Sequence, residues 1–363
     1  MAYARTVHLI PNLGRGGVQQ VISTLISGVE DQNELIGTAG GDGIKDLEKL
    51  GIHWIRIPLF PSTPLNAVRS FIVLKRVIRK YEIGMIHSHH RFSSLVGRAV
   101  AKAMNIPIVS TVHDLADGRR FISRVALGNV VIVFSRAVST HLIERFGVKP
   151  EYIHRVPMGI PSVAGPTHAQ ILETKRQMGC TPLAPIVGFV GRLSREKAPD
   201  VFLQAAQKVV SSFPDCRFFI LGDGEMRCEL ESLCRNLGIS ENVSFLGWQD
   251  DVTLFISCAD FVVITSLREG FGRVVIESFM LRKPVIATRV GGLTELVQHK
   301  QNGLLVPPGK SSNMAEAIKI LLEDRELQQQ MGNTAYDRVQ GRFSLEAMLR
   351  GVNLVYLSVL KRH

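Results

Sequence analysis

Short apolar runs rich in β-branched residues alternate along the chain with longer segments in which apolar residues recur at helical spacing. The first run covers residues 6–10, and an apolar-periodic segment at 18–28 follows it. This alternation is typical of a parallel sheet with helices on both faces. It predicts strands at residues 6–10, 53–57, 85–87, 108–111, 130–134, 186–190, 217–221, 243–245, 261–264, 285–287 and 303–306, and helices at 18–28, 65–81, 93–104, 137–146, 200–213, 225–237, 251–257 and 274–281.

The alternation breaks once, near the middle of the chain. Pro157-Met158-Gly159-Ile160-Pro161 is rich in turn residues and is typical of a linker. Because the pattern resumes afterwards, the sequence predicts an α/β fold with two doubly wound, Rossmann-like domains at residues 1–163 and 164–345. Ligands of open α/β sheets bind beyond the carboxyl ends of the strands, so we expect the two domains to face a cleft.

Length and composition narrow the class of protein. With 363 residues, 45% hydrophobic and 21% charged, the chain is long enough for two packed cores and too apolar to be disordered or fibrous. No apolar run approaches the ~20 residues that a membrane-spanning helix needs, and the first twenty residues do not resemble a secretory signal. The five cysteines lack the C-x2-C spacing of zinc or redox sites, so we expect a reduced, cytoplasmic environment.

The net charge of +11 is concentrated in the first half, because residues 1–165 contain 20 Lys and Arg against 11 Asp and Glu. Within that half, Val68–Tyr81 combines apolar residues at helical spacing with five basic residues. Such a helix can lie on an anionic membrane, here the inner face of the cytoplasmic membrane. It can equally be an ordinary surface helix in which the methylene chains of Lys and Arg cover apolar area. Nucleic acid is not expected, because few aromatic residues are present to stack on bases.

Glycines follow the first predicted strand, in Gly14-Arg15-Gly16-Gly17-Val18-Gln19. They let the backbone approach a ligand at the start of a helix, and they are equally compatible with a plain strand-to-helix turn. A dinucleotide-binding fingerprint needs glycine where Gln19 stands, so no nicotinamide or flavin cofactor is expected.

A second candidate loop, residues 191–197, follows the strand at 186–190. It contains Arg192 and Lys197, a planar guanidinium and a compact ammonium that suit diphosphate oxygens. The alternative is a solvated surface loop with an ordinary ion pair between Arg195 and Glu196.

The most specific cluster, residues 266–277, follows the strand at 261–264 and opens a helix. Gly270 and Gly272 expose backbone amides at the positive end of that helix, which favours a bound anion. Glu269 precedes this turn and Glu277 lies about one turn inside the helix, so the two carboxylates can contact different parts of one ligand.

Glu269-Gly270-Phe271-Gly272, with Glu277 eight residues after Glu269, resembles the E-x7-E signature of the retaining, nucleotide-sugar-dependent glycosyltransferases of family 4, which have the GT-B fold. The resemblance covers nearly the whole chain and implies transfer of a sugar from a nucleotide-diphosphate sugar to an acceptor. Its other segments are Gly16–Gln19, Ile86–His89, Thr111–Asp114, Gly191–Arg192 with Lys197, Leu221–Gly224, Phe245–Gly247, Gly291–Glu295 and Gly303–Val306.

The resemblance also implies roles for individual residues. Arg192 and Lys197 would hold the donor diphosphate, Glu277 the ribose hydroxyls, and Glu269 the transferred sugar. His113 would lie across the cleft near the reacting carbon, so the expected catalytic residues are His113, Arg192, Lys197 and Glu269. The expected donor-binding residues are Gly16, Gly17, Arg192, Lys197, Leu246, Trp248, Gly270, Phe271, Gly272, Arg273, Val274 and Glu277. By the same resemblance, a last helix at residues 346–363 would pack back onto the first domain.

Four positions depart from the family's usual pattern. Met158 and Pro161 replace frequent linker residues, Ala198 stands where glycine is common, and Thr294 stands where proline is common. The diphosphate and carboxylate residues themselves are intact.

No metal is expected, because the sequence offers no convincing acidic pair to hold a divalent ion. Arg192, Lys197 and a helix N-terminus would stabilise the leaving diphosphate instead. His87, His89 and His90 suggest a metal site, but no carboxylate or cysteine nearby in the sequence completes a ligand set, and histidine is common in loop turns.

The resemblance implies a glycosyltransferase of bacterial lipopolysaccharide, capsule or other cell-surface glycan synthesis, with a nucleotide sugar as donor and a glycan or lipid-linked acceptor. Two alternatives remain open at this point: a sugar-nucleotide epimerase or hydrolase of the same fold, and a non-catalytic scaffold on a membrane surface. A scaffold would have no use for Arg192, Lys197, Glu269 and Glu277 together.

Overall fold

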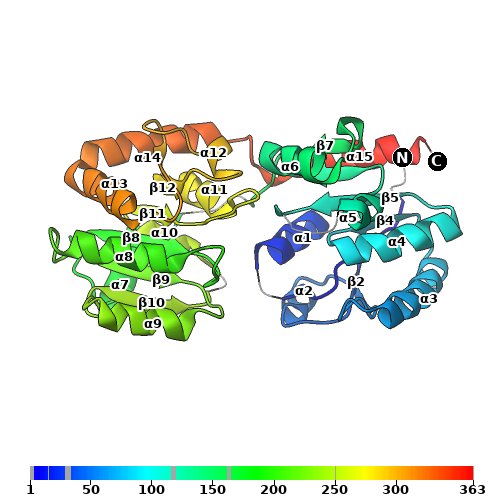
Figure 1. Ribbon diagram of the computed structural model, residues 1–363, viewed down its shortest axis with the longest axis horizontal. Coiled ribbons are helices and arrows are strands. Elements are labelled where there is room, and N and C mark those ends of the chain that lie inside the picture. The colour runs from blue at the N-terminus through cyan, green and yellow to red at the C-terminus, as the bar shows by residue number, and fades with distance from the viewer. Residues whose placement is uncertain are drawn as a thin grey trace. The chain divides into compact units, whose positions relative to one another are not determined.

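Two parallel sheets form the framework of the chain (Figure 1). The computed structural model describes residues 4–14, 16–28, 34–115, 120–161, 165–249 and 251–362. The chain divides into two units, residues 1–161 with 343–363 and residues 162–342. The boundaries predicted from the sequence fall a few residues later, after 163 and 345.

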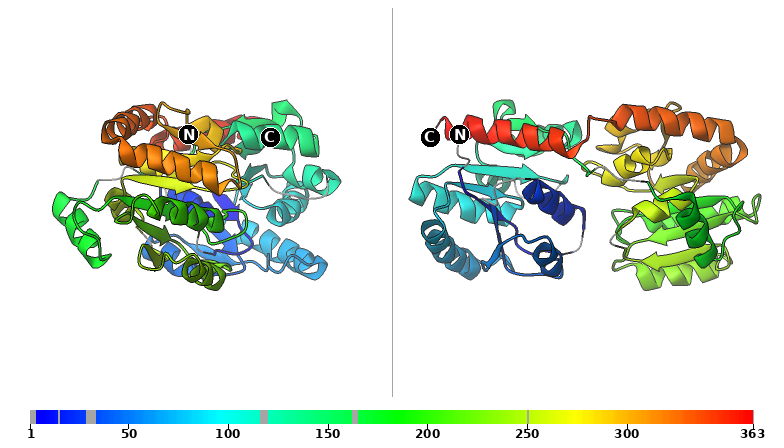
Figure 2. Two further views of the ribbon diagram at one scale, coloured as in Figure 1. Left: turned by 60° about the vertical axis from the view of Figure 1, so that its left-hand side comes forward. Right: turned by 180° about the vertical axis from the view of Figure 1, so that it is seen from behind.

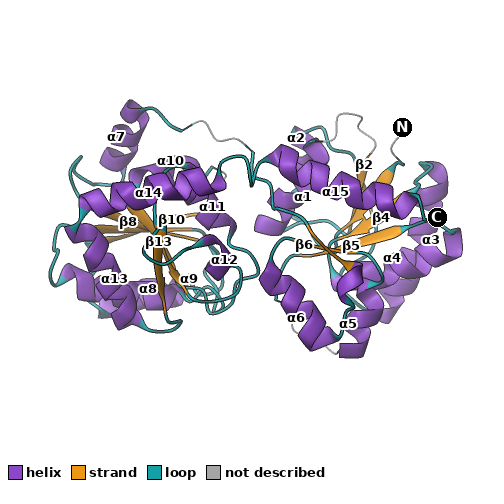
Figure 3. Cartoon of the chain, turned by 90° about the horizontal axis from the view of Figure 1, so that it is seen from above, coloured by secondary structure: helices purple, strands orange, loops and turns teal. Residues whose placement is uncertain are grey.

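The sheet of the first unit has the strand order β3-β2-β1-β4-β5-β6-β7, and every pairing is parallel. Helices lie on both faces, with α1, α2 and α15 on one and α3 to α6 on the other (Figure 3). The strands are β1 (Thr6–Leu9), β2 (Glu34–Thr38), β3 (Trp54–Arg56), β4 (Met85–Ser88), β5 (Ile108–Val112), β6 (Val131–Val133) and β7 (Ile153–Arg155). The helices are α1 (Gly17–Ser27), α2 (Ile44–Lys49), α3 (Pro64–Lys80), α4 (Arg91–Met104), α5 (Arg120–Leu127), α6 (Arg136–Phe146), the short 3₁₀ helix η1 (Pro150–Tyr152) and α15 (Leu345–Leu360).

The sheet of the second unit has the order β10-β9-β8-β11-β12-β13 and is also entirely parallel. Helices α8, α9 and α13 cover one face, and α7, α10 and α11 cover the other (Figure 3). The strands are β8 (Ile186–Val190), β9 (Arg217–Leu221), β10 (Val243–Gly247), β11 (Phe261–Ile264), β12 (Val285–Thr288) and β13 (Gly303–Val306). The helices are α7 (His168–Gln177), α8 (Pro199–Val210), α9 (Arg227–Asn236), α10 (Thr253–Cys258), α11 (Arg273–Met280), α12 (Leu293–Leu296), α13 (Ser311–Glu323) and α14 (Arg325–Val339).

The predicted α/β class with two doubly wound parallel sheets is confirmed. Four strands, β8, β9, β11 and β13, have the predicted bounds. The sequence prediction missed β2 and β7, and it missed helices α2, α5, α7 and α12 to α14. β2 was missed because Glu34 and Gly37 interrupt its apolar run, although all five of its residues are buried.

The C-terminal helix α15 belongs to the first unit (Figure 2). Ser344 caps its first turn by accepting a hydrogen bond from the Ala347 N–H at 3.2 Å. Met348 is fully buried, and its sulfur accepts from the Gly159 N–H. Farther along, the Tyr356 hydroxyl lies 2.6 Å from His87 Nδ1 of β4, so this helix closes one face of the first sheet.

In each sheet the strand order reverses at one point, between β1 and β4 and between β8 and β11. At these points, the connections that follow the two neighbouring strands run to opposite faces of the sheet. A crevice therefore forms at the carboxyl ends of the strands, and ligands of this architecture bind there. In this protein the crevices lie beside the segments that follow β1 and β4 and those that follow β8 and β11. None of the described helices has the length and hydropathy needed to cross a bilayer.

Candidate functional site

An ion pair joins the two loops at the switch point of the second unit. The Lys197 ammonium, in the loop after β8, lies 2.6 Å from Glu269 Oε2, in the loop after β11. Ser266 donates a hydrogen bond to the same carboxylate oxygen at 3.0 Å. The side chain of Glu269 is 12% exposed and that of Lys197 is 29% exposed. The structure thus brings together a cation and a carboxylate that lie 72 positions apart in the sequence.

Two hydrogen bonds to main-chain carbonyl groups connect the loop after β8 with the loop after β11. Thr265 donates its hydroxyl to the Lys197 carbonyl at 2.8 Å, and the Leu267 N–H donates to the Glu196 carbonyl at 2.8 Å. The Lys197–Glu269 pair is therefore positioned by the main chain as well as by its own attraction.

The glycines after Glu269 shape the start of α11. Gly272 is the N-cap in the left-handed region, with φ 98°, and a Cβ there would meet Leu293 Cδ2 at 2.7 Å. No side chain of the described residues caps the helix, and the Val275 N–H donates to the Gly272 carbonyl at 3.0 Å. The N–H groups of Arg273 and Val274 are the ones that an anionic ligand at the positive end of the helix can use.

A second ion pair lies on the first turn of α11. Arg273 Nε donates to Glu277 Oε1 at 2.7 Å, and both side chains are mostly buried. Arg273 Nη1 is buried and has no hydrogen-bond partner among the described residues. A buried guanidinium N–H without an acceptor is costly, so this group is suited to a ligand oxygen. The i, i+4 spacing of Arg273 and Glu277 on one helix is the sequence signal from which this pair can be predicted.

Arg192 differs from Lys197 in its surroundings. Its side chain is exposed and pairs with no described side chain, so the predicted convergence of Arg192 and Lys197 on one diphosphate stays a prediction. The backbone beside it is tightly packed, because a Cβ on Gly222 would lie 2.0 Å from the Gly191 carbonyl oxygen. Ala198 is the buried N-cap of α8 at φ 45°, a left-handed conformation that explains why glycine is common there.

The remaining expected donor-binding residues lie at the end of β10, at the start of α11 and in the first unit. Leu246 is the next-to-last residue of β10, and Trp248 is the first residue after this strand. Both side chains are partly buried. Phe271 and Gly270 are buried, and Val274 lies in the first turn of α11. Gly16 is the N-cap of α1, and Gly17 is its first residue. A Cβ on either glycine would meet nothing within 4 Å, so packing among the described residues does not require glycine there.

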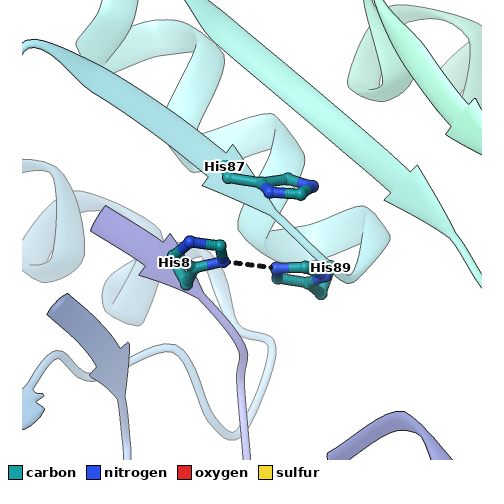
Figure 4. A group of neighbouring side chains, drawn as sticks. All are labelled: His8, His87 and His89. Carbon is teal, nitrogen blue, oxygen red and sulfur yellow. Dashed lines mark hydrogen bonds between the residues drawn. The ribbon is translucent and has the colours of Figure 1, made fainter. Parts of the chain in front are cut away.

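Histidines gather at the switch point of the first unit, where β1 and β4 end. His8 Nδ1 lies 2.9 Å from His89 Nε2 (Figure 4), and His89 Nδ1 lies 3.3 Å from His113 Nε2. At the other end, His8 Nε2 lies 3.1 Å from Glu34 Oε2 of β2. Of these residues, His113 is predictable from the sequence, whereas His8 and Glu34 are not, because their sequence neighbours form no local motif.

Burial controls the protonation of this cluster. It lowers the pKa of His113 to about 4. Burial, reinforced by the neighbouring histidines, also lowers the pKa of His87 and of His89 well below the usual value. Neutral imidazoles are therefore expected for these three residues at neutral pH.

The histidine cluster corrects one sequence interpretation. His87 is a buried strand residue and not part of a loop turn, and the structure supplies the carboxylate of Glu34 that the sequence seemed to lack. His8, His87 and His89 bring ring nitrogens within 4.8 Å of one another. However, His87 already uses Nδ1 for Tyr356 and Nε2 for Thr111, each at 2.6 Å, and His8 and His89 bond to each other. We therefore assign no metal to this cluster. His90 has a different role: it is the N-cap of α4, and its side chain accepts a hydrogen bond from the Phe92 N–H.

Comparison with known proteins relates both units to sugar-transferring enzymes. Residues 173–338 match the model of glycosyl transferases group 1, and residues 15–162 match that of glycosyltransferase family 4. A D-inositol 3-phosphate glycosyltransferase of Corynebacterium kroppenstedtii is 28% identical over 83% of this chain and 72% of its own. The lipopolysaccharide core biosynthesis glycosyltransferase LpsE of Rhizobium meliloti is 34% identical over 46% of this chain and 47% of its own. The crystal structure of HepE from Anabaena in complex with UDP-glucose has a TM-score of 0.89 at 24% identity, over 98% of this chain and 100% of HepE.

Proposed function

Because the chain belongs to the group 1, family 4 glycosyltransferases, we propose that it moves a sugar from a nucleotide-diphosphate donor to an acceptor with retention of anomeric configuration. The observation that carries the proposal is the Lys197–Glu269 pair beside the uncapped N-terminus of α11. It combines a cation, a carboxylate and free amides at the switch point of the second sheet.

The pair suggests how donor binding proceeds. A diphosphate competes with Glu269 for the Lys197 ammonium and also accepts from the α11 amides, while Arg192 adds an exposed cation. Glu269 then keeps its carboxylate for hydroxyl groups of the transferred sugar. Arg273 Nη1 and Glu277 bind polar groups of the nucleoside, and the turn with Leu246 and Trp248 contacts the base.

In the proposed reaction, the bond from the anomeric carbon to the diphosphate oxygen breaks as the acceptor oxygen bonds to the same face of that carbon. The acceptor proton passes to the leaving phosphate. Negative charge grows on the diphosphate, where Lys197, Arg192 and the helix N-terminus stabilise it without a metal ion. Gly16 and Gly17 of the first unit contribute backbone that a ligand can approach closely, since no described side chain fills the space beside them.

The acceptor is proposed to be a glycan or lipid-linked glycan of the cell surface. The similarity to LpsE, whose name assigns it to lipopolysaccharide core synthesis, supports this class. The inositol-phosphate glycosyltransferases among the relatives show that other acceptors occur within the same family.

A membrane contact through α3 fits such an acceptor. The outer face of α3 exposes Leu65 (58%), Val68 (60%) and Ile72 (45%), while Leu74 and Ile78 pack into the core. Exposed basic residues continue the same face, namely Arg69, Arg76, Arg79 and Lys80. Exposed apolar side chains flanked by cations suit the interface of an anionic bilayer, so we propose that α3 rests on the cytoplasmic membrane.

A thermal-shift panel of nucleotide diphosphates and their sugars tests the donor proposal. A donor present at 100 times its Kd should stabilise the protein by about 2.7 kcal/mol. UDP and UDP-glucose belong in the panel because HepE was crystallised with them. Nucleoside monophosphates serve as controls, because they lack the second phosphate. If no diphosphate raises the melting temperature, the donor proposal fails.

Product analysis separates transfer from the alternatives. With donor and acceptor together, a transferase forms a new glycoside. A hydrolase releases free sugar, and an epimerase changes the donor sugar, each without any acceptor. Either of the last two results would overturn the transfer proposal.

A further inference from the structure

Four side chains of the first unit form one unbranched string. Glu34 of β2 contacts His8 of β1, His8 contacts His89 at the end of β4, and His89 contacts His113 at the end of β5. Glu34 Oε2 and His8 Nε2 are buried and lie 3.1 Å apart, but neither atom makes a hydrogen bond among the described residues, so their contact is electrostatic. At the far end, His113 Nδ1 is also buried and has no described partner.

The carboxylate of Glu34 sets the direction of the two hydrogen bonds between the histidines. A neutral imidazole has one donor nitrogen and one acceptor nitrogen, and an ionised carboxylate only accepts. A carboxylate oxygen 3.1 Å from His8 Nε2 attracts an N–H and repels a lone pair, so the proton of His8 is favoured on Nε2, which leaves Nδ1 to accept from His89 Nε2–H. The same rule then makes His89 Nδ1 accept from His113 Nε2–H.

We propose that Glu34, acting through His8 and His89, fixes the tautomer of His113 so that its unprotonated Nδ1 accepts a hydrogen bond from a hydroxyl group of the sugar substrate. Glu34, His8 and His89 are positioning residues in this scheme, and only His113 contacts substrate. The inference rests on the proposed sugar transfer, because it assigns the buried Nδ1 its missing partner.

The surroundings of the string favour this neutral arrangement. Glu34 supplies the carboxyl group that faces His8, and the other titratable groups packed around them are His87 of β4 and Tyr356 of α15. Burial lowers the pKa of His89 and of His113, so neither ring adds a second proton that would break the sequence of donors and acceptors. A doubly protonated His8 would instead donate to His89 and reverse every later bond.

Nuclear magnetic resonance of the full-length protein with ¹⁵N-labelled histidine tests the proposal. Long-range ¹H–¹⁵N correlations at pH 8 distinguish the two tautomers, and single substitutions of His8, His89 and His113 assign their signals. The expected result is protonated Nε2 in all three residues. A proton on His113 Nδ1, or two protons on His8, would overturn the inference.

A pair of variants gives the kinetic readout. Glu34→Gln keeps the shape of the side chain but lets either end of its amide face His8, so the tautomer of His113 is no longer fixed. We expect kcat to fall on the order of 10–100-fold, as for other groups that orient a catalytic histidine, with KM for the donor little changed. Tyr356→Phe is the matched control, because it removes a buried hydrogen bond to His87 and leaves the string intact.

The outcomes separate the two proposals. If Glu34→Gln transfers sugar at the wild-type kcat while its fold is retained, the inference fails and the proposed function stands. If the wild-type protein shows the expected tautomers but binds no nucleotide sugar, the proposed function fails, and with it the assignment of a sugar hydroxyl to His113. Should Glu34→Gln not fold, the wild-type tautomers alone decide the matter.

Discussion

Glu269 is the residue on which the proposed chemistry most directly depends, because its carboxylate is held by both Lys197 and Ser266. Glu269→Gln keeps the size of the side chain and removes its charge. We expect the rate of sugar transfer to fall about 10²–10³-fold, as when one preorganised electrostatic group is lost. Steady-state transfer assays and circular dichroism measure the loss and the retained fold.

Glu229→Gln is the matched control for that substitution. Glu229 pairs with Arg195 at 2.8 Å, but both side chains are more than half exposed, and exposed pairs contribute little. Transfer by the Glu229→Gln variant should equal that of the wild type. An equal loss of rate in both variants would show that the net charge of the protein, and not the position of Glu269 beside Lys197, controls the rate.

The buried histidines of the first unit make its stability depend on pH. Burial lowers the pKa of His113 to about 4, below the value near 6.5 of an unfolded chain. Between these values the unfolded state binds the extra proton, so stability is complete above pH 6.5 and is lost as the pH falls toward 4. The pKa values of His87 and His89 are lowered in the same direction. Each histidine adds a slope of up to about 1.4 kcal/mol per pH unit in this window.

Urea unfolding in the Trp248→Phe variant isolates this effect, because Trp54 of β3 then reports on the first unit alone. His113→Gln should show a shallower decline in unfolding free energy between pH 6.5 and 4 than its parent. Equal pH dependence in the two proteins would exclude a buried, neutral His113.

Helix α15 contributes to the core of the first unit although it follows the second unit in sequence. Met348 is fully buried beside Gly159, so Met348→Ala should destabilise the first unit by about 2–5 kcal/mol. Leu354→Ala on the same helix is the control, because its side chain is 69% exposed and should change stability by less than about 0.5 kcal/mol. Chemical unfolding followed by Trp54 fluorescence compares them, and similar losses would mean that α15 does not pack through Met348.

Helix α3 provides the test of membrane contact. Replacing Arg76 and Arg79 by Glu should greatly reduce cosedimentation with vesicles rich in phosphatidylglycerol, because each basic residue near an anionic surface contributes about 1 kcal/mol. Lys208→Glu and Lys175→Glu, on helices of the second unit, form the control pair. Unchanged binding after the α3 substitutions would make this helix an ordinary surface helix.

The sequence predicted elements well where a strand is mainly an apolar run, as in β8, β9 and β11. Strand β2 was not predicted, because Glu34 and Gly37 are residue types that are common in loops. The fold explains both residues. Glu34 lies 3.1 Å from His8, and a Cβ on Gly37 would lie 2.5 Å from Ile57 Cδ1. The Lys197 and Glu269 loops were predictable because each carries a local motif. The Glu34–His8–His89 string was not, because only strand order brings its members together.

At the scale of the whole molecule, the two units have separate cores and different chemical character. The excess of positive charge lies in residues 1–165, together with the histidine string and α3, whereas the candidate diphosphate site lies on the loops after β8 and β11. On this division we propose that the first unit handles the acceptor and the second unit handles the donor.

The central claim is that the loops after β8 and β11 bind the diphosphate of a nucleotide sugar. Hydrogen–deuterium exchange of the full-length protein, with and without a saturating nucleoside diphosphate, tests it most directly. The account predicts slower exchange of backbone amides at residues 191–198 and 266–277. Unchanged exchange in both segments at saturation, or slower exchange confined to the first unit, would contradict it.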